Sequence, residues 1–174
     1  MPCQTCSQPK IYMQRVPTGY AGTRQTVHLI GQLIHQGAKD FGVRQTAIDI
    51  YFQYGVRPKD YLGEIAALFD WVRQNIRYTR DIYRVETLHT ARRMLQLRAG
   101  DCDDQTILLG SMLKATGHPV RLALVGFNPK KPRLFTHIYL EAQHHSGWIP
   151  LDTTVNRPMG WAPPAAHKKT FRID

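Results

Sequence analysis

The sequence predicts an α+β fold in which helices come first and an antiparallel sheet follows. Two observations carry this prediction. Apolar residues recur at helical spacing through the first part of the chain, and beyond Pro119 they alternate as they do in strands. A length of 174 residues, with 43% hydrophobic and 21% charged residues, suits one globular domain with a single core.

The region before Gly100 is predicted to be mainly helical. Residues 1–24 are rich in polar residues, Pro and Gly and have no clear periodicity, so an arm is expected there. The further elements expected are helices from Thr26, over residues 43–54, over residues 60–76 and over residues 87–97, with a short extended piece over residues 78–81.

A cysteine lies at the predicted start of the next helix, in the segment Gly100-Asp101-Cys102-Asp103-Asp104. A thiolate at this place gains from the helix dipole and from nearby backbone donors. The three neighbouring aspartates act the other way, because like charges disfavour ionisation of the thiol. Cys102 therefore needs a cationic partner if it is to react at neutral pH, and histidine is the usual one.

Three strands are expected after this helix, over residues 120–125, 135–142 and 148–152. Folding the chain at the turn over residues 144–147 brings position 152 near positions 138 and 139. His137 and Asp152 then lie within a residue or two of being cross-strand neighbours. An imidazole so placed can present one nitrogen to a thiol and the other to a carboxylate.

Each of these three residues also has a common structural explanation. A lone cysteine on a helix is often a small buried residue, and a histidine at a strand end is often a surface residue. An aspartate before threonines at a strand end, as at Asp152-Thr153-Thr154, often forms a turn. The order and spacing of Cys102, His137 and Asp152 favour a site. After them, residues 158–174 are expected to form an extended, Pro-containing tail on the surface.

Three segments resemble the signature segments of the transglutaminase-like superfamily. They are Gly100–Asp104, Thr136–Tyr139 and Trp148–Thr154, preceded by Trp71-Val72, by Ile76-Arg77-Tyr78 and by Asp81. The resemblance covers roughly residues 60–155. It implies a papain-like core, in which the nucleophile helix packs on the antiparallel sheet, and a catalytic triad of Cys102, His137 and Asp152.

The same resemblance implies acyl transfer on amide bonds. Cys102 would attack a carbonyl and form a thioester, and peptide or amide hydrolysis is expected rather than cross-linking. The oxyanion would be held by the Cys102 backbone N–H and a second donor. Trp71 and Tyr78 are candidates for that donor, although both residue types are more often core residues.

The helical lead-in, the short chain and the Pro-rich end are similar to versions encoded by tailed bacteriophages and prophages. This similarity implies virion assembly or host entry, with another phage protein or a bacterial wall peptide as substrate. The alternative is a virion structural or assembly protein that keeps the fold without turnover. The organisation expected is an arm over residues 1–24, a domain over residues 25–157 with its lead-in over residues 25–58, and the tail over residues 158–174.

Metal and cofactor signals are weak. Some bacterial relatives bind calcium through acidic residues beside the nucleophile, which makes Asp101, Asp103 and Asp104 candidate calcium ligands. The other explanation is that aspartates in a first helical turn satisfy backbone amides. No other cofactor is expected. A zinc site at Cys3 and Cys6 would need further ligands, such as His28 or His35.

A formal charge of +10 favours anionic partners, but the basic residues are scattered, so nucleic-acid binding is not expected. No apolar run is long enough to span a membrane. The N-terminal residues lack the pattern of a signal peptide. Synthesis in the cytoplasm, with a possible later place in a virion, is therefore expected.

Overall fold

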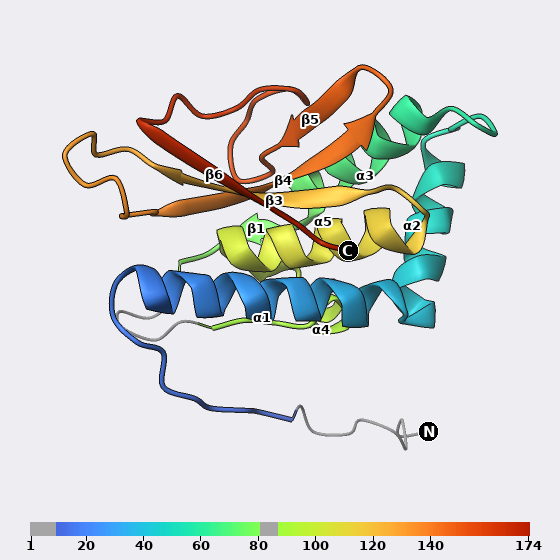
Figure 1. The fold of residues 1–174 in the computed structure, drawn as a ribbon. Coiled ribbons are helices and arrows are strands. Elements are labelled where there is room, and N and C mark those ends of the chain that lie inside the picture. Colours follow the sequence, from blue (N-terminus) through green and yellow to red (C-terminus); the bar gives the residue numbers. More distant parts are fainter. Residues whose placement is uncertain (1–9, 81–86) are drawn as a thin grey trace.

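The computed structural model describes residues 10–80 and 87–174, and it confirms the α+β prediction (Figure 1). Cys3, Cys6 and Asp81, which the sequence analysis singled out, lie outside the described residues. The helices are α1 (Tyr20–Ala38), α2 (Phe41–Gln53), α3 (Tyr61–Asn75), α4 (Ala91–Leu97) and α5 (Cys102–Ala115). The strands are β1 (Arg77–Tyr78), β2 (Ala99–Gly100), β3 (Val120–Gly126), β4 (His137–His144), β5 (Gly147–Leu151) and β6 (His167–Arg172).

Helix α5 is the centre of the molecule. Each of its residues from Asp103 to Leu113 is buried, because the helix contacts α1, α2, α3 and α4 as well as strands β3 and β4. Figure 1 shows the sheet on one side of α5 and α1 on the other. A helix that is covered on every side is held rigidly, so the position of its first residue is fixed by the whole core.

Aspartates begin three of the helices, in the way expected of residues that satisfy free backbone amides. The side chains of Asp40, Asp60 and Asp101 accept hydrogen bonds from backbone N–H groups in the first turns of α2, α3 and α5. Helix α1, in contrast, begins at Tyr20 and so inside the predicted arm. The residues around Gly22 carry few apolar side chains, so this first turn shows no periodicity in the sequence.

The main sheet has the strand order β5-β4-β3-β6, and every neighbouring pair is antiparallel. The first three of these strands were predicted. The fourth was expected to be part of a surface tail, but residues 167–172 pair with residues 121–126 of β3, with Phe171 opposite Leu122. The consecutive polar residues Lys168, Lys169 and Thr170 hide the alternation that would have indicated a strand.

A second, two-stranded sheet lies before α5. Strand β1 pairs in parallel with β2, so that Tyr78 lies opposite Gly100. This pairing brings the end of the α3–β1 segment beside the start of α5. Among the helices of the described residues, none is both long enough and apolar enough to cross a membrane.

Candidate active site

Cys102 is the first residue of α5, and the turn that carries it is shaped by its neighbours. The Oδ1 atom of Asp101 accepts hydrogen bonds from the backbone N–H groups of Asp103 at 3.0 Å and Asp104 at 3.2 Å. Gly100 passes so close to the helix that a Cβ there would lie 2.6 Å from the Cβ of Asp104. The cap and this close approach fix the backbone at Cys102, and the thiol is left half-buried.

His137 and Asp152 come together across the β4–β5 hairpin. Leu140 pairs with Leu151, so Asp152 continues this register opposite Tyr139. The Nε2 atom of His137 is 2.7 Å from Oδ2 of Asp152. An imidazole held through Nε2 presents its Nδ1 to a second partner.

The carboxylate of Asp152 is buried and well satisfied. Its Oδ1 accepts hydrogen bonds from the backbone N–H of Thr154 at 3.1 Å and from the Thr154 hydroxyl at 2.6 Å. Burial alone would raise the pKa of Asp152, but its bonds with His137 and Thr154 outweigh burial and lower that pKa below its usual value. The group is therefore an anion at neutral pH, suited to orient the imidazole.

The thiol of Cys102 lies against the start of β4. Its sulfur receives a hydrogen bond from the backbone N–H of Ile138, the residue that follows His137. The structure therefore brings the three predicted residues to one place, where α5 and β4 begin and β5 ends. The contacts that join them are the His137–Asp152 hydrogen bond and the approach of Cys102 to Ile138.

The electrostatic surroundings of Cys102 oppose its ionisation. Burial raises the pKa of the thiol most, and the charges of Asp103 and Asp101 raise it further. The sulfur lies 3.6 Å from Oδ1 of Asp103. The hydrogen bond from Ile138 lowers the pKa but does not outweigh these effects. Cys102 is thus a neutral thiol at neutral pH, and nucleophilic attack requires a base that takes its proton.

Of the three predicted calcium ligands, Asp101 and Asp103 lie close together and Asp104 is turned toward His89. Asp104 is buried, and its two carboxylate oxygens bind His89, one at the backbone N–H (2.8 Å) and one at Nδ1 (2.9 Å). In the described part of the chain, Asp101, Cys102 and Asp103 form the one group whose ligand atoms lie within 4.8 Å of one another. A thiol is a soft ligand and the Asp101 carboxylate already caps α5, so this set fits calcium poorly.

The two predicted oxyanion donors have different surroundings. Trp71 is 6% exposed and belongs to the core, with the Arg98 guanidinium 4.6 Å from its ring. Tyr78 is 45% exposed. Burial and then the charge of Cys102 raise the pKa of Tyr78, and Tyr78 pairs with Gly100, two residues before the cysteine. Of the two, Tyr78 is the one that borders the site.

A cavity of about 540 Å³ reaches Thr153, which follows Asp152, and Gln105, which lies one helical turn after Cys102. It is bounded by residues 73–78 of α3 and β1, by Gln105 of α5, and by residues 153–156 after β5. Sequence reasoning missed Gln105. The signal available was a polar residue three positions after Cys102, on the helix face that carries the nucleophile.

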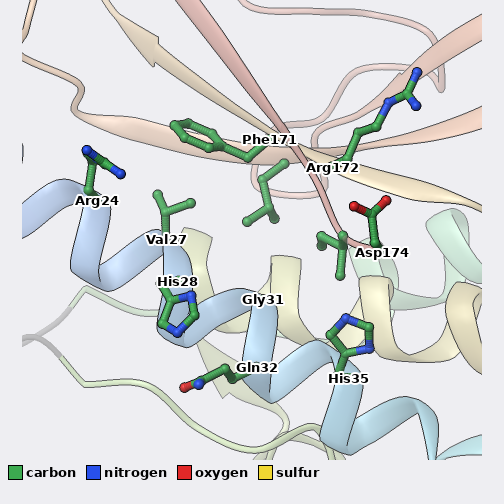
Figure 2. A pocket seen from close by; sticks show the side chains of 11 residues that line it. Arg24, Val27, His28, Gly31, Gln32, His35, Phe171, Arg172 and Asp174 are labelled. Carbon is green, nitrogen blue, oxygen red and sulfur yellow. The ribbon is translucent and has the colours of Figure 1, made fainter.

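A second hollow, of about 340 Å³, lies between α1 and the C-terminal strand. Figure 2 shows Arg24, His28 and His35 of α1 on one side, and Phe171 and Arg172 on the other. This hollow contains no thiol, so it is separate from the nucleophile. His28 and His35, considered above as zinc ligands, lie here on α1, and that zinc site stays a prediction because Cys3 and Cys6 are not described.

Comparison with known proteins bears on both the family and the fold. The family model of the transglutaminase-like superfamily matches residues 52–153, more than half of the chain. A candidate cysteine protease from Cytophaga hutchinsonii is similar in structure, with a TM-score of 0.50 and 23% identity over 74% of this chain and 46% of that one.

A candidate protease from Parabacteroides distasonis gives a TM-score of 0.59 and 13% identity over 85% of this chain and 29% of that one. The present chain therefore spans less than half the length of either protein, and at these identities the likeness concerns the fold. A search of curated proteins finds no match.

Proposed function

Because this chain belongs to the transglutaminase-like superfamily, we propose that it is a thiol enzyme that transfers acyl groups from amides. In this proposal Cys102 is the nucleophile, His137 is the general base and Asp152 orients the base. Its net reaction is the hydrolysis of a peptide or amide bond. The substrate is a protein or a bacterial wall peptide.

One observation carries this proposal. The 2.7 Å bond between His137 Nε2 and the buried Asp152 carboxylate leaves Nδ1 of His137 available for a second partner. The thiol of Cys102 is hydrogen-bonded to the backbone of Ile138, the residue that follows His137 in β4. An ionised carboxylate stabilises the imidazolium that forms when His137 takes a proton. This arrangement supports His137 as the base that a neutral, buried thiol needs.

The proposed steps balance as follows. As the Cys102 sulfur attacks the amide carbonyl carbon, its proton passes to His137. The tetrahedral intermediate then breaks the C–N bond, and His137 gives the proton to the leaving amine, which leaves a thioester. Water attacks the thioester while His137 takes its proton, and the released sulfur regains that proton as the acid departs.

Two donors are proposed for the negative oxygen of the tetrahedral intermediate. The backbone N–H of Cys102 belongs to the first turn of α5, where amides have no partner inside the helix. The Tyr78 hydroxyl is the second candidate, supported by its exposure and by the effect of the Cys102 charge on its pKa.

The proposal is tested by alkylation of Cys102 with iodoacetamide, in a chain whose other two cysteines, Cys3 and Cys6, are replaced by serine. Cys102 should react at mild pH, and His137→Ala should slow the reaction. Cys102→Ala is the control for labelling elsewhere. Equal rates in the parent and the His137→Ala variant would refute an activated thiol. A trapped acyl adduct on Cys102 would then identify the substrate.

A phage or prophage setting, in virion assembly or host entry, is also part of the proposal and is supported by the sequence resemblance. Tail or head genes beside this gene would support it, and their absence would count against it. Co-purification of the chain with virions, without release of a cleaved partner, would favour the alternative of a structural or assembly role.

A further inference from the structure

Two of the residues that line the 540 Å³ cavity, Arg73 and Gln105, each have a buried side-chain atom that makes no hydrogen bond within the described residues. We infer that this cavity is a substrate subsite that binds one backbone amide of a peptide, with Gln105 accepting from the peptide N–H and Arg73 donating to the peptide carbonyl. The inference rests on the proposed function, since it places the substrate that Cys102 would attack.

Gln105 supplies the acceptor. Its side chain is 1% exposed, it lines the cavity, and its Oε1 has no hydrogen-bond partner in the part of the chain that the structure describes. A buried acceptor without a partner costs roughly 1–3 kcal/mol, so such atoms are rare and need an explanation. Gln105 lies one helical turn after Cys102 on α5. A ligand donor at this distance from the nucleophile provides that explanation.

Arg73 supplies the donor. Its Nη1 donates to Oδ1 of Asn156 at 2.6 Å and its Nη2 donates to Oδ1 of Asp70 at 3.2 Å. Its Nε is buried and, within residues 10–80 and 87–174, has no acceptor. The two outer bonds fix the plane of the guanidinium. The remaining N–H is therefore a preorganised donor at the wall of the cavity.

The pairing of one acceptor with one donor selects the ligand. A carboxylate would accept from Arg73 but would leave the Gln105 oxygen without a donor. An ammonium group would donate to Gln105 but would leave the Arg73 N–H without an acceptor. A peptide bond carries one N–H and one C=O and satisfies both. The cavity also extends to Tyr78, which pairs with Gly100 two residues before Cys102, and to Thr153, which follows Asp152. A bound peptide would therefore run toward the three proposed catalytic residues.

The test compares a peptide with its ester analogues, which lack one N–H donor but keep the shape. The probes are N-acetyl-triglycine amide and the analogues in which one amide at a time becomes an ester. Binding is followed by NMR titration of the full chain with Cys102→Ala, which prevents turnover. We expect one ester analogue to bind roughly 2- to 10-fold more weakly than the peptide, the effect of one neutral hydrogen bond.

In the Gln105→Met variant the peptide should bind as weakly as that ester, and the difference between the two probes should disappear. The variant should fold, because methionine has a similar shape and removes an unpaired buried acceptor. Thermal unfolding checks this point. Gln32→Met, in the other hollow, is the matched control and should leave both affinities unchanged.

A second variant tests the donor. Arg73→Lys keeps the positive charge but loses the Nε–H, so the peptide should bind roughly 10- to 150-fold more weakly, the effect of one hydrogen bond to a charged group. Equal affinity of the peptide and every ester for the parent would refute the inference, as would unchanged peptide affinity in Gln105→Met. Neither result would touch the proposed function, which depends on the alkylation of Cys102 and is measured separately.

Discussion

Asp103 opposes the ionisation of Cys102, and replacing it with asparagine tests how strongly. The carboxylate oxygen and the sulfur are 3.6 Å apart, and Asp103 is 7% exposed. The substitution keeps the size of the side chain and removes its charge. Since Asp103 is not one of the three residues proposed to react or to orient the base, the expected change is in the thiol alone.

The magnitude follows from Coulomb's law. Two unit charges at this separation repel by about 1 kcal/mol in a water-like medium and by about 5 kcal/mol at an effective dielectric constant of about 20. Each 1.4 kcal/mol is about a factor of ten in an equilibrium constant. Asp103→Asn should therefore increase the thiolate fraction at neutral pH by at least roughly 5-fold, and by up to roughly 4000-fold if the site is well shielded from water.

The assay is the rate of iodoacetamide alkylation of Cys102 as a function of pH, in the background without Cys3 and Cys6. The midpoint of the profile should move to lower pH in Asp103→Asn, and the rate at pH 7 should rise. Asp49→Asn, an equal loss of charge at an exposed position of α2, should leave the profile unchanged. A midpoint that stays in place or moves to higher pH in Asp103→Asn would refute the electrostatic reasoning.

Three further predictions concern the stability of the site and its core. The pKa of Asp152 is lowered in the folded protein, so its contribution to stability is present above its pKa in the unfolded chain and is lost as pH falls through the folded pKa. Between pH 5 and pH 3, the free energy of unfolding measured by denaturation should therefore fall less in Asp152→Asn than in the parent. An equal fall would contradict this prediction. Asp101→Ala removes the cap of α5 and should cost about 0.5–2 kcal/mol in urea unfolding, whereas Asp101→Asn should cost less because asparagine also caps. Leu108→Ala, at a fully buried position of α5, should cost about 2–5 kcal/mol, and a cost below 1 kcal/mol would show that α5 is not the centre of the core.

The elements that carry the site could be predicted because their signals are local. A glycine and an N-cap residue in the segment from Gly100 to Asp104, followed by an apolar run from Ile107, define the start of α5. The pairing of His137 with Asp152 follows from the position of one turn, since the register of a hairpin is set by its loop. These two inferences need no knowledge of distant parts of the chain.

What could not be predicted depends on contacts between distant segments. Strand β6 is polar at most positions, and it is a strand because β3 offers an unpaired edge. The orientation of Asp104 toward His89, away from a calcium site, depends on a loop fifteen residues earlier in the chain. The buried, unpaired oxygen of Gln105 is visible only once residues 73–78 and 153–156 close the cavity around it.

The burial of α5 on all sides has a consequence for the synthesis of the chain on the ribosome. Helices α1 to α4 leave the ribosome before α5 and can cover part of it at once, but the strands that cover its remaining face are translated later. Until they arrive, an apolar face of α5 is exposed to the cell, and the thiol at its end has neither histidine nor carboxylate beside it. By the proposed mechanism, the nascent chain would therefore pass through an interval in which it is prone to aggregate and has no hydrolytic activity.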